Sequence, residues 1–183
     1  MKFTETKLKG CYILEPTVFD DGRGWFMESY NQRRFNEGVG QDVTFVQDNQ
    51  SFSTKAVIRG LHFQTGAHAQ AKLVQVLRGE VLDVAVDLRP DSSTFGHYES
   101  VVLSGENRRQ FFVPRGFAHG FQVLSETAVF FYKCDNFYNK ESEGGVRFDD
   151  PTIAIKWHDL GVAPLISDKD EVLPVLEKAR AVW

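Results

Sequence analysis

The chain contains 183 residues, 42% of them hydrophobic, and carries a formal net charge of −4. This length suffices for one packed domain and is short for two, so we expect a single domain covering residues 1–183. The net negative charge argues against a nucleic-acid or membrane partner, because both attract proteins through clustered Lys and Arg. No segment approaches the roughly 20 apolar residues that a membrane-spanning helix needs.

The cysteine content indicates the redox compartment. The sequence has two cysteines, Cys11 and Cys134, and its first residues are polar where a secretory leader would be apolar. We therefore predict a reduced, cytoplasmic setting.

In chain order, the first predicted element is a helix over Asn31–Val39. The middle third of the chain predicts β-structure. From Leu82 to Leu88 every second residue is apolar, and Asp83 and Asp87 stand among the residues between them. This alternation is typical of a strand.

Further β-rich runs occupy Val101–Leu103 and Ala128–Tyr132. Turn-forming glycines separate the runs, namely Gly79, Gly96, Gly105 and Gly116. Near the end, Asp168–Ala181 has a helical pattern that Pro174 interrupts.

Repeated short strands without intervening helices indicate an all-β fold with short peripheral helices. The pattern predicts an antiparallel sheet that is closed or sandwiched, the class that includes jelly rolls and cupin-type barrels. The sequence holds 16 Phe, 5 Tyr and 3 Trp. We expect most of these rings to fill the barrel interior and a dimer interface, and the remainder to line a ligand cavity.

The general cupin pattern supplies a metal with two histidines, a glutamate and a later histidine. Counting back from Gly79, Lys72 occupies the place of the carboxylate, and Gly66 and His68 occupy the two upstream histidine positions. An ammonium repels a divalent metal at short range, and His68 and His119 alone are too few ligands for a stable site. We therefore predict neither a metal nor another cofactor.

Several motifs in sequence order resemble those of a known family, the dTDP-4-dehydrorhamnose 3,5-epimerases of deoxysugar nucleotide biosynthesis. They are Phe19-Asp20-Asp21-Gly22-Arg23-Gly24 with Phe26, Glu28 and Ser29; Phe45-Val46-Gln47-Asp48-Asn49; Arg59-Gly60-Leu61-His62; Lys72-Leu73-Val74; Gly79 to Asp87; Pro114 to Phe121; Tyr132-Lys133; and Ser167-Asp168-Lys169-Asp170. The resemblance covers nearly the whole chain. It implies a homodimeric cupin-type jelly roll without metal, acting on a dTDP-4-keto-6-deoxyhexose.

The resemblance also implies catalytic roles. The C3 and C5 hydrogens of such a sugar lie α to the C4 ketone, so a side-chain base can remove them. His62 matches the family's base and Asp170 its carboxylate partner. Tyr132 matches the acid, and Lys72 offsets the charge of the enolate. From the residues alone, a strand aromatic is the favoured interpretation of Tyr132, and a hydrogen-bonded barrel histidine is at least as good an interpretation of His62.

Further positions match the family's substrate-binding residues. They are Arg23, Phe26, Glu28, Gln47, Asn49, Arg59, Lys72, His119, Tyr138, Glu143 and Lys169. The guanidinium groups suit a diphosphate, and the Tyr138 ring suits stacking on thymine. A solvated surface position is the alternative for each arginine, and a packed core histidine is the alternative for His119.

The chain departs from the family pattern in one region. Phe63 replaces a tyrosine that is common after the catalytic histidine, and Thr65-Gly66-Ala67-His68 replaces a segment with proline and tyrosine. Three other functions stay open on sequence: an epimerase that inverts one centre only, a non-catalytic sugar-nucleotide-binding cupin, and a metal-dependent cupin, against which Lys72 argues.

Overall fold

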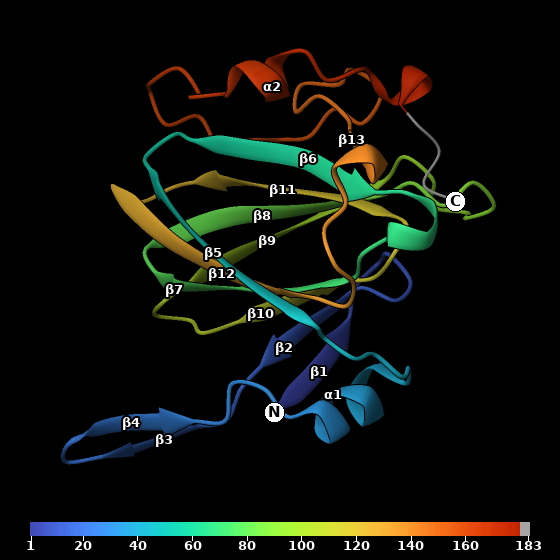
Figure 1. Cartoon of the computed structure of the whole chain (residues 1–183). Coiled ribbons are helices and arrows are strands. Elements are labelled where there is room, and N and C mark those ends of the chain that lie inside the picture. The colour runs from blue at the N-terminus through green and yellow to red at the C-terminus, as the bar shows by residue number, and fades with distance from the viewer. Residues whose placement is uncertain (180–183) are drawn as a thin grey trace.

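The computed structural model describes residues 1–179, and strands dominate this range (Figure 1). One sheet has six strands in the order β1-β2-β10-β7-β12-β5. Their bounds are β1 Lys2–Glu5, β2 Tyr12–Glu15, β10 Gln110–Val113, β7 Lys72–Arg78, β12 Thr127–Cys134 and β5 Gln47–Thr54.

A second sheet has five strands in the order β13-β6-β11-β8-β9. Their bounds are β13 Glu143–Gly145, β6 Ile58–Gln64, β11 Phe117–Val123, β8 Glu80–Asp87 and β9 Tyr98–Ser104. All pairings in both sheets are antiparallel. The sheets face each other without closing into one ring, and the molecule is a cupin-type jelly roll. The predicted all-β class is confirmed.

Both faces of β8 are buried, so its alternation of apolar and polar residues does not mark one exposed face. Val81 and Ala85 belong to the cluster between the two sheets, whereas Leu82, Val84 and Val86 pack in a second cluster. That second cluster includes residues of the C-terminal segment, which crosses the outer side of β6 in Figure 1. Side chains alternate along a strand, so Asp83 is directed to the interior between the sheets.

The predicted helix over Asn31–Val39 is confirmed as α1, Gln32–Val39. Asn31 is its N-cap and accepts a hydrogen bond from the backbone N–H of Arg34 at 3.2 Å. Gly40 ends the helix with φ 67°, a left-handed conformation that glycine adopts without a steric penalty. The buried Phe35 ring anchors α1 below the six-stranded sheet by edge contact with Phe112.

The predicted helix over Asp168–Ala181 is wrong. Helix α2 covers only Asp168–Glu171, and a 3-10 helix follows at Leu176–Lys178. Pro174 stands between them, and a proline inside a helix removes a backbone donor and clashes with the preceding turn. The last two residues of the predicted helix lie outside the described residues.

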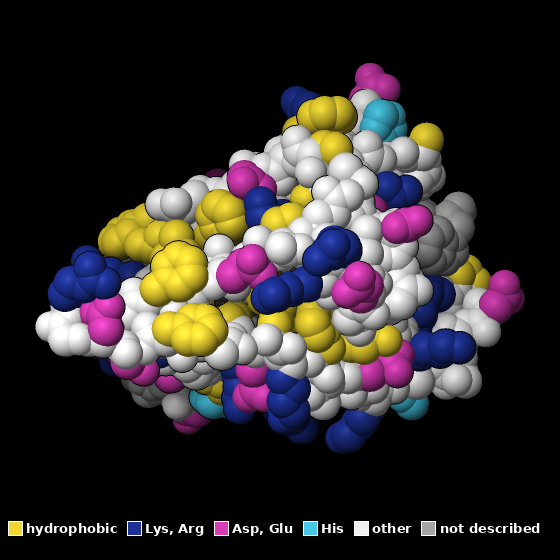
Figure 2. All heavy atoms as spheres, turned by 90° about the horizontal axis from the view of Figure 1, so that it is seen from below, with side chains coloured by type: hydrophobic (Ala, Val, Ile, Leu, Met, Phe, Trp, Pro, Cys, Tyr) yellow, Lys and Arg dark blue, Asp and Glu magenta, His cyan; other side chains and the backbone are white. Residues whose placement is uncertain are grey.

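Strands β3, Val18–Asp21, and β4, Gly24–Met27, form a separate hairpin that projects from the barrel (Figure 1). Its aromatic rings are exposed: Phe19 by 60%, Trp25 by 53% and Phe26 by 68%. Figure 2 shows hydrophobic side chains gathered on this end of the lower face. An apolar patch of this kind indicates a contact surface.

Within residues 1–179, the helices are all too short or too polar to cross a bilayer. Cys11 and Cys134 are both buried and are not joined by a disulfide.

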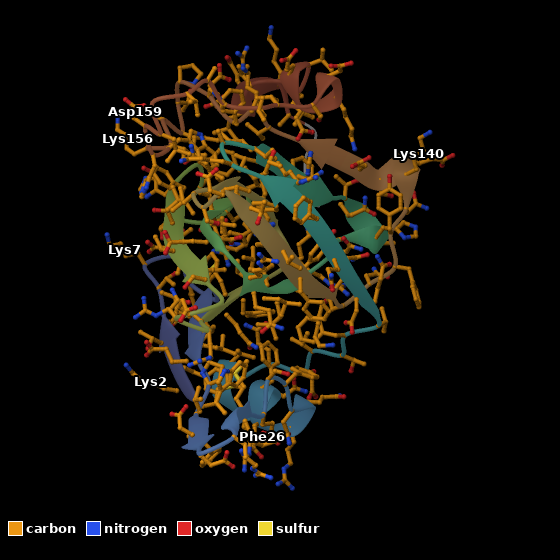
Figure 3. The ribbon with its side chains drawn as sticks, turned by 90° about the vertical axis from the view of Figure 1, so that its left-hand side faces the viewer. Lys2, Lys7, Phe26, Lys140, Lys156 and Asp159 are labelled. Carbon is orange, nitrogen blue, oxygen red and sulfur yellow. The ribbon has the colours of Figure 1, made fainter. Side chains whose placement is uncertain are left out.

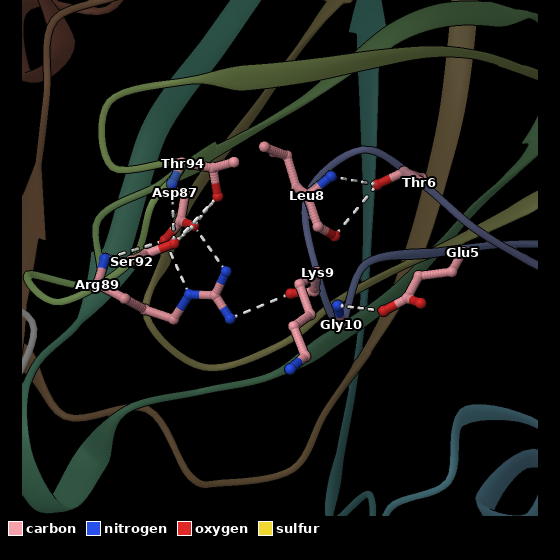
Figure 4. Close-up of polar contacts among 9 residues, drawn as sticks. All are labelled: Glu5, Thr6, Leu8, Lys9, Gly10, Asp87, Arg89, Ser92 and Thr94. Atoms are coloured by element: carbon pink, nitrogen blue, oxygen red, sulfur yellow. Dashed lines mark hydrogen bonds and ion pairs between the residues drawn. The ribbon is translucent and has the colours of Figure 1, made fainter.

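Asp87, at the end of β8, is fully buried and organises the following turn (Figure 4). Arg89 donates to it through Nε at 2.8 Å and Nη2 at 2.6 Å, and the hydroxyls of Ser92 and Thr94 donate at 2.6 and 2.7 Å. Arg89 also donates to the carbonyl of Lys9 at 3.0 Å, which ties the turn to the N-terminal loop. The network stabilises this end of the barrel.

The Asp87 network predicts an acid-sensitive contribution to stability. Burial acts to raise the pKa of Asp87, but the hydrogen bonds from Arg89, Ser92 and Thr94 outweigh it and lower the pKa to about 2. The unfolded pKa is about 3.9, so the contribution is complete above about pH 5 and is lost as the pH falls through about 2. We expect Asp87→Asn to reduce the free energy of unfolding at neutral pH by about 2 kcal/mol. Urea unfolding of both proteins across this range should show a weaker pH dependence in the variant, and identical pH dependence would contradict the assignment.

Candidate active site

A cavity of about 600 Å³ lies between the two sheets and is lined by residues from both. A smaller cavity of about 300 Å³ shares four of these residues with it, Asn49, His62, Lys72 and Tyr132. The two cavities therefore bring together most of the residues that the sequence singled out. Those in the larger cavity are Asn49, Arg59, His62, Lys72, His119, Tyr132, Lys169 and Asp170. Gln47, Tyr138 and Glu143 line the smaller one.

His62 and Asp170 form a hydrogen-bonded pair at the cavity wall. His62 lies on β6, and its Nε2 is 2.7 Å from Asp170 Oδ1. The other carboxylate oxygen, Oδ2, accepts the backbone N–H of Gly60 at 3.1 Å. Burial acts to raise the pKa of Asp170, but the hydrogen bond from His62 leads the opposing contributions, which leave the pKa below its usual value. The ionised carboxylate fixes the imidazole in one orientation.

Local structure sets the position of Asp170. Ser167 caps the short helix α2, and its hydroxyl accepts the backbone N–H of Asp170 at 3.3 Å. Asp170 is buried, whereas Asp168 is exposed. The second aspartate of the motif, not the first, therefore reaches His62.

Two glycines allow β6 and β11 to approach closely beside this pair. Gly60 has φ +126°, and a Cβ atom there would lie 2.6 Å from the Cα of Gly120. Larger residues would force the strands apart. The close approach places His62 and His119 opposite each other in the β6–β11 register.

The facing sheet contributes Tyr132 and Lys72. Tyr132 on β12 pairs with Asn49 of β5 and with Val74 of β7. Burial raises the pKa of Tyr132, so its phenol stays protonated at neutral pH. Burial lowers the pKa of Lys72, although the nearby Cys134, Asp83 and Glu143 oppose this shift. The cavity thus holds a phenol donor and the amino group of Lys72 on the wall opposite the histidines.

His119 has a carboxylate partner of its own. Its Nε2 lies 2.9 and 3.0 Å from the two oxygens of Asp83, which is fully buried on β8. Burial raises the pKa of Asp83, while His119 and Lys72 act to lower it. Sequence reasoning missed Asp83, because its alternation with apolar residues is typical of a strand with one polar, exposed face.

A polar network lies at the wall of the smaller cavity. The Tyr138 hydroxyl donates to Glu143 at 3.1 Å, and Glu143 also forms an ion pair with Lys169. Burial acts to raise the pKa of Glu143, but the ion pair with Lys169 outweighs it and the pKa is lowered. The backbone N–H of Tyr138 donates to Gln47 at 3.2 Å. These contacts hold the exposed Tyr138 ring beside the cavity.

The predicted binding arginines are placed differently. Arg59 lines the larger cavity and is oriented by Ser53, to which its Nε donates at 3.0 Å. Arg23, Phe26 and Glu28 lie in or beside the β3–β4 hairpin, which projects from the barrel in Figure 1, and Figure 3 labels Phe26 at this end of the molecule. The Arg23 side chain is 91% exposed, and Glu28 pairs with Arg34. A single chain does not bring these three residues into its own cavity.

Phe63 and residues 65–68, where the chain departs from the family pattern, lie near the end of strand β6 and directly after it. The Phe63 ring is buried in the second apolar cluster, where a Cβ on Gly144 would lie 2.3 Å from it. Gly66–His68 forms a 3-10 helix. His68 lines neither of the two cavities, so it does not lie with His119 as a second metal ligand in the cavity. Among residues 1–179, no three His, Cys, Asp or Glu side chains are grouped as metal ligands.

The chain matches the family model described as dTDP-4-dehydrorhamnose 3,5-epimerase over residues 5–178. It is 53% identical to the dTDP-4-dehydrorhamnose 3,5-epimerase of Salmonella typhimurium over 175 residues, which cover 96% of this chain and 95% of that protein. A crystal structure of the enzyme with this name from Elizabethkingia anophelis superposes with a TM-score of 0.93 at 58% identity, covering 97% of each chain.

A dTDP-6-deoxy-D-glucose-3,5-epimerase from Legionella pneumophila, solved in complex with dTDP-4-keto-L-rhamnose, has a TM-score of 0.93 at 48% identity. The match covers 97% of this chain and 93% of that one. With the family model spanning most of the sequence and the fold shared in full, the chain belongs to the dTDP-4-dehydrorhamnose 3,5-epimerase family.

Proposed function

We propose that the chain inverts C3 and C5 of dTDP-4-keto-6-deoxy-D-glucose and produces dTDP-4-keto-L-rhamnose, for dTDP-L-rhamnose or a related deoxysugar. The observation that carries this proposal is the His62–Asp170 pair, 2.7 Å apart, in a cavity with Tyr132 and Lys72 on the facing sheet. Epimerisation changes no oxidation state, so this chemistry needs a base, an acid and a stabilised enolate but no redox cofactor.

His62 removes the proton from the carbon next to the ketone. The ionised Asp170 orients the imidazole and stabilises the imidazolium that forms. Electrons from the broken C–H bond move to the C4 oxygen and produce an enolate. Lys72 and His119, which line the same cavity, offset its negative charge.

Tyr132 returns a proton to the opposite face of the ring. Its raised pKa keeps the hydroxyl protonated until the carbanion accepts the proton. Inversion leaves His62 protonated and Tyr132 ionised, and exchange of protons with water restores both. The same cycle at the second carbon completes the double inversion.

The remaining cavity residues hold the nucleotide. Arg59 presents a guanidinium that suits the diphosphate. Gln47 and Asn49 present amide groups that can bond the hydroxyls of the sugar and the polar edge of the base. Tyr138 stacks on thymine, and Glu143, itself paired with Lys169, holds the Tyr138 hydroxyl.

We also propose a homodimer in which the β3–β4 hairpin reaches the second copy. The hairpin exposes three aromatic rings, and β5 at the edge of the six-stranded sheet exposes Phe52 by 61%. Arg23, Phe26 and Glu28 line neither of the two cavities of their own chain, and Figure 3 labels Phe26 at the hairpin end of the molecule. In a dimer they bind the substrate in the other copy's cavity, which accounts for both observations.

A complementation experiment tests this arrangement. Arg23→Ala and His62→Ala chains, each weakly active alone, are co-expressed with different tags and the mixed dimer is isolated. One of its two cavities then has His62 and also receives Arg23 from the other chain, so we expect about half of wild-type activity. If Arg23 serves the cavity of its own chain, the mixed dimer stays as weak as its parents, which would contradict the proposal.

Product analysis tests the proposed reaction against the single-centre alternative. Borohydride reduction of the C4 ketone after the reaction should yield 6-deoxy-L-mannose and 6-deoxy-L-talose. Inversion at C3 alone leaves sugars of the D-series, and inversion at C5 alone leaves the starting configuration at C3. Tight binding without any conversion would favour the non-catalytic binding module.

We further propose that residues 1–183 constitute one dTDP-sugar epimerase domain. The family match over residues 5–178 supports this proposal. A cytoplasmic location is proposed from the two cysteines, which are free thiols in the structure.

A further inference from the structure

We propose that Asp83 is a positioning residue for the epimerisation, which acts through His119 and supplies the buried negative charge that His119 and Lys72 share. Asp83 is not among the residues lining either cavity, because it lies behind His119. The inference rests on the proposed function, since it specifies how the enolate-stabilising groups are held.

The contacts of Asp83 are few and directed at one partner. Its side chain is fully buried, and within residues 1–179 both of its oxygens bond only the Nε2 of His119, at 2.9 and 3.0 Å. An ionised carboxylate only accepts, so Nε2 carries a hydrogen towards Asp83. The ring donates to the enolate oxygen from Nδ1 when that nitrogen carries a second hydrogen, and Asp83 stabilises this imidazolium form. Asp83 thereby fixes which ring nitrogen of His119 the substrate meets.

Comparison with Asp87 separates this arrangement from a structural one. Both aspartates are fully buried on β8, four positions apart. Asp87 accepts from Arg89, Ser92 and Thr94, and these bonds stabilise a turn at the end of the barrel (Figure 4). Asp83 connects to no turn or loop. A buried carboxylate is costly, and an apolar residue would fill the same interior position at a lower cost.

His119 and Asp83 form the same kind of histidine–carboxylate pair as His62 and Asp170. His62 and His119 pair directly across β6 and β11, and each has its own carboxylate. Asp170 approaches from outside the barrel and Asp83 from the neighbouring interior strand. The cavity therefore contains two oriented imidazoles, one assigned to proton removal and the other to the enolate oxygen.

Asp83 also acts on Lys72 through its charge. Cys134, Asp83 and Glu143 act on Lys72 through their charges. The other titratable or charged residues that line a cavity with Lys72 are Arg59, His62, His119, Tyr132, Tyr138, Lys169 and Asp170. Burial lowers the pKa of Lys72, and the charge of Asp83 opposes that shift. Removing the charge of Asp83 lowers the pKa of Lys72 further, so Lys72 loses its proton at a lower pH.

The test compares Asp83→Asn with the matched variant Asp87→Asn in the full-length protein. We expect Asp83→Asn to reduce kcat for epimerisation about 100-fold with KM changed less than about threefold, and to move the alkaline limb of activity to lower pH. Asp87→Asn should retain wild-type kcat and the wild-type pH profile. Wild-type kcat in Asp83→Asn would overturn the proposal.

Two further measurements separate positioning from loss of folding. In ¹⁵N spectra of histidine-labelled protein, Asp83→Asn should change the His119 ring signals and leave those of His62 in place. At a pH below the alkaline limb, where the effect of Asp83 on Lys72 does not limit the rate, the double variant Asp83→Asn/His119→Gln should have the kcat of His119→Gln alone, because Asp83 acts there through that ring. Unchanged His119 signals, or losses that multiply in the double variant, would count against the proposal. Absence of exchange in the wild type would instead reject the proposed function, while the ¹⁵N spectra would still report whether Asp83 orients His119.

Discussion

Replacing His62 by alanine is expected to reduce the epimerisation rate by a factor of about 10² to 10⁴, the usual contribution of a general base. The substitution removes the proton acceptor and leaves Asp170 without its imidazole partner. The His62 side chain is 29% exposed at the cavity wall, so its removal leaves no large void in the core. The rate of hydrogen exchange at C3 and C5, followed by proton NMR, measures the loss.

His97→Ala is the matched control, because His97 is exposed in the connection between β8 and β9 and lines neither cavity. It should exchange both hydrogens at the wild-type rate. Circular dichroism should show the same β-sheet content in both variants. A folded His62→Ala protein with wild-type turnover would contradict the assignment of the base.

Tyr132→Phe is expected to separate proton exchange from inversion. The variant keeps His62, which removes a proton and returns it to the same face of the ring. It lacks the hydroxyl that protonates the opposite face from β12. We expect inversion to slow by about 10² to 10⁴ and exchange to slow much less. Deuterium content and configuration of the recovered sugar, measured in one sample, give both rates.

Tyr98→Phe provides the control for loss of a phenol hydroxyl. The Tyr98 hydroxyl accepts the backbone N–H of Lys156 at 3.1 Å, and the residue lines neither cavity. This variant should invert both centres at the wild-type rate. An equal loss of exchange and inversion in Tyr132→Phe would show that the two steps do not depend on separate residues.

The cavity-lining residues that the sequence singled out lie in local motifs. His62 and His119 lie on strands whose glycines allow close pairing, and both motifs are visible in the sequence. Asp170 was predicted from its motif, and Ser167 three residues earlier is a helix-capping signal that supports its position. Helix α1 was likewise predicted from local sequence signals.

The parts that the sequence did not predict depend on distant packing. Asp83 lies in an alternating strand, and only the C-terminal segment over the other face of β8 turns that aspartate inward. The helix predicted over Asp168–Ala181 ends after Glu171, because helical periodicity does not compensate for Pro174. The position of Arg23, away from its own cavity, follows from the projection of the β3–β4 hairpin from the barrel, a direction that the motif around Arg23 does not specify.

The measurement that tests the proposed reaction most directly is deuterium incorporation by the wild-type protein. The purified protein is incubated with dTDP-4-keto-6-deoxy-D-glucose in heavy water, and C3 and C5 are followed by NMR. We expect deuterium at both carbons, together with the L-configured product. Deuterium at only one carbon would contradict double epimerisation, and its absence from both carbons despite substrate binding would contradict catalysis by His62 and Tyr132.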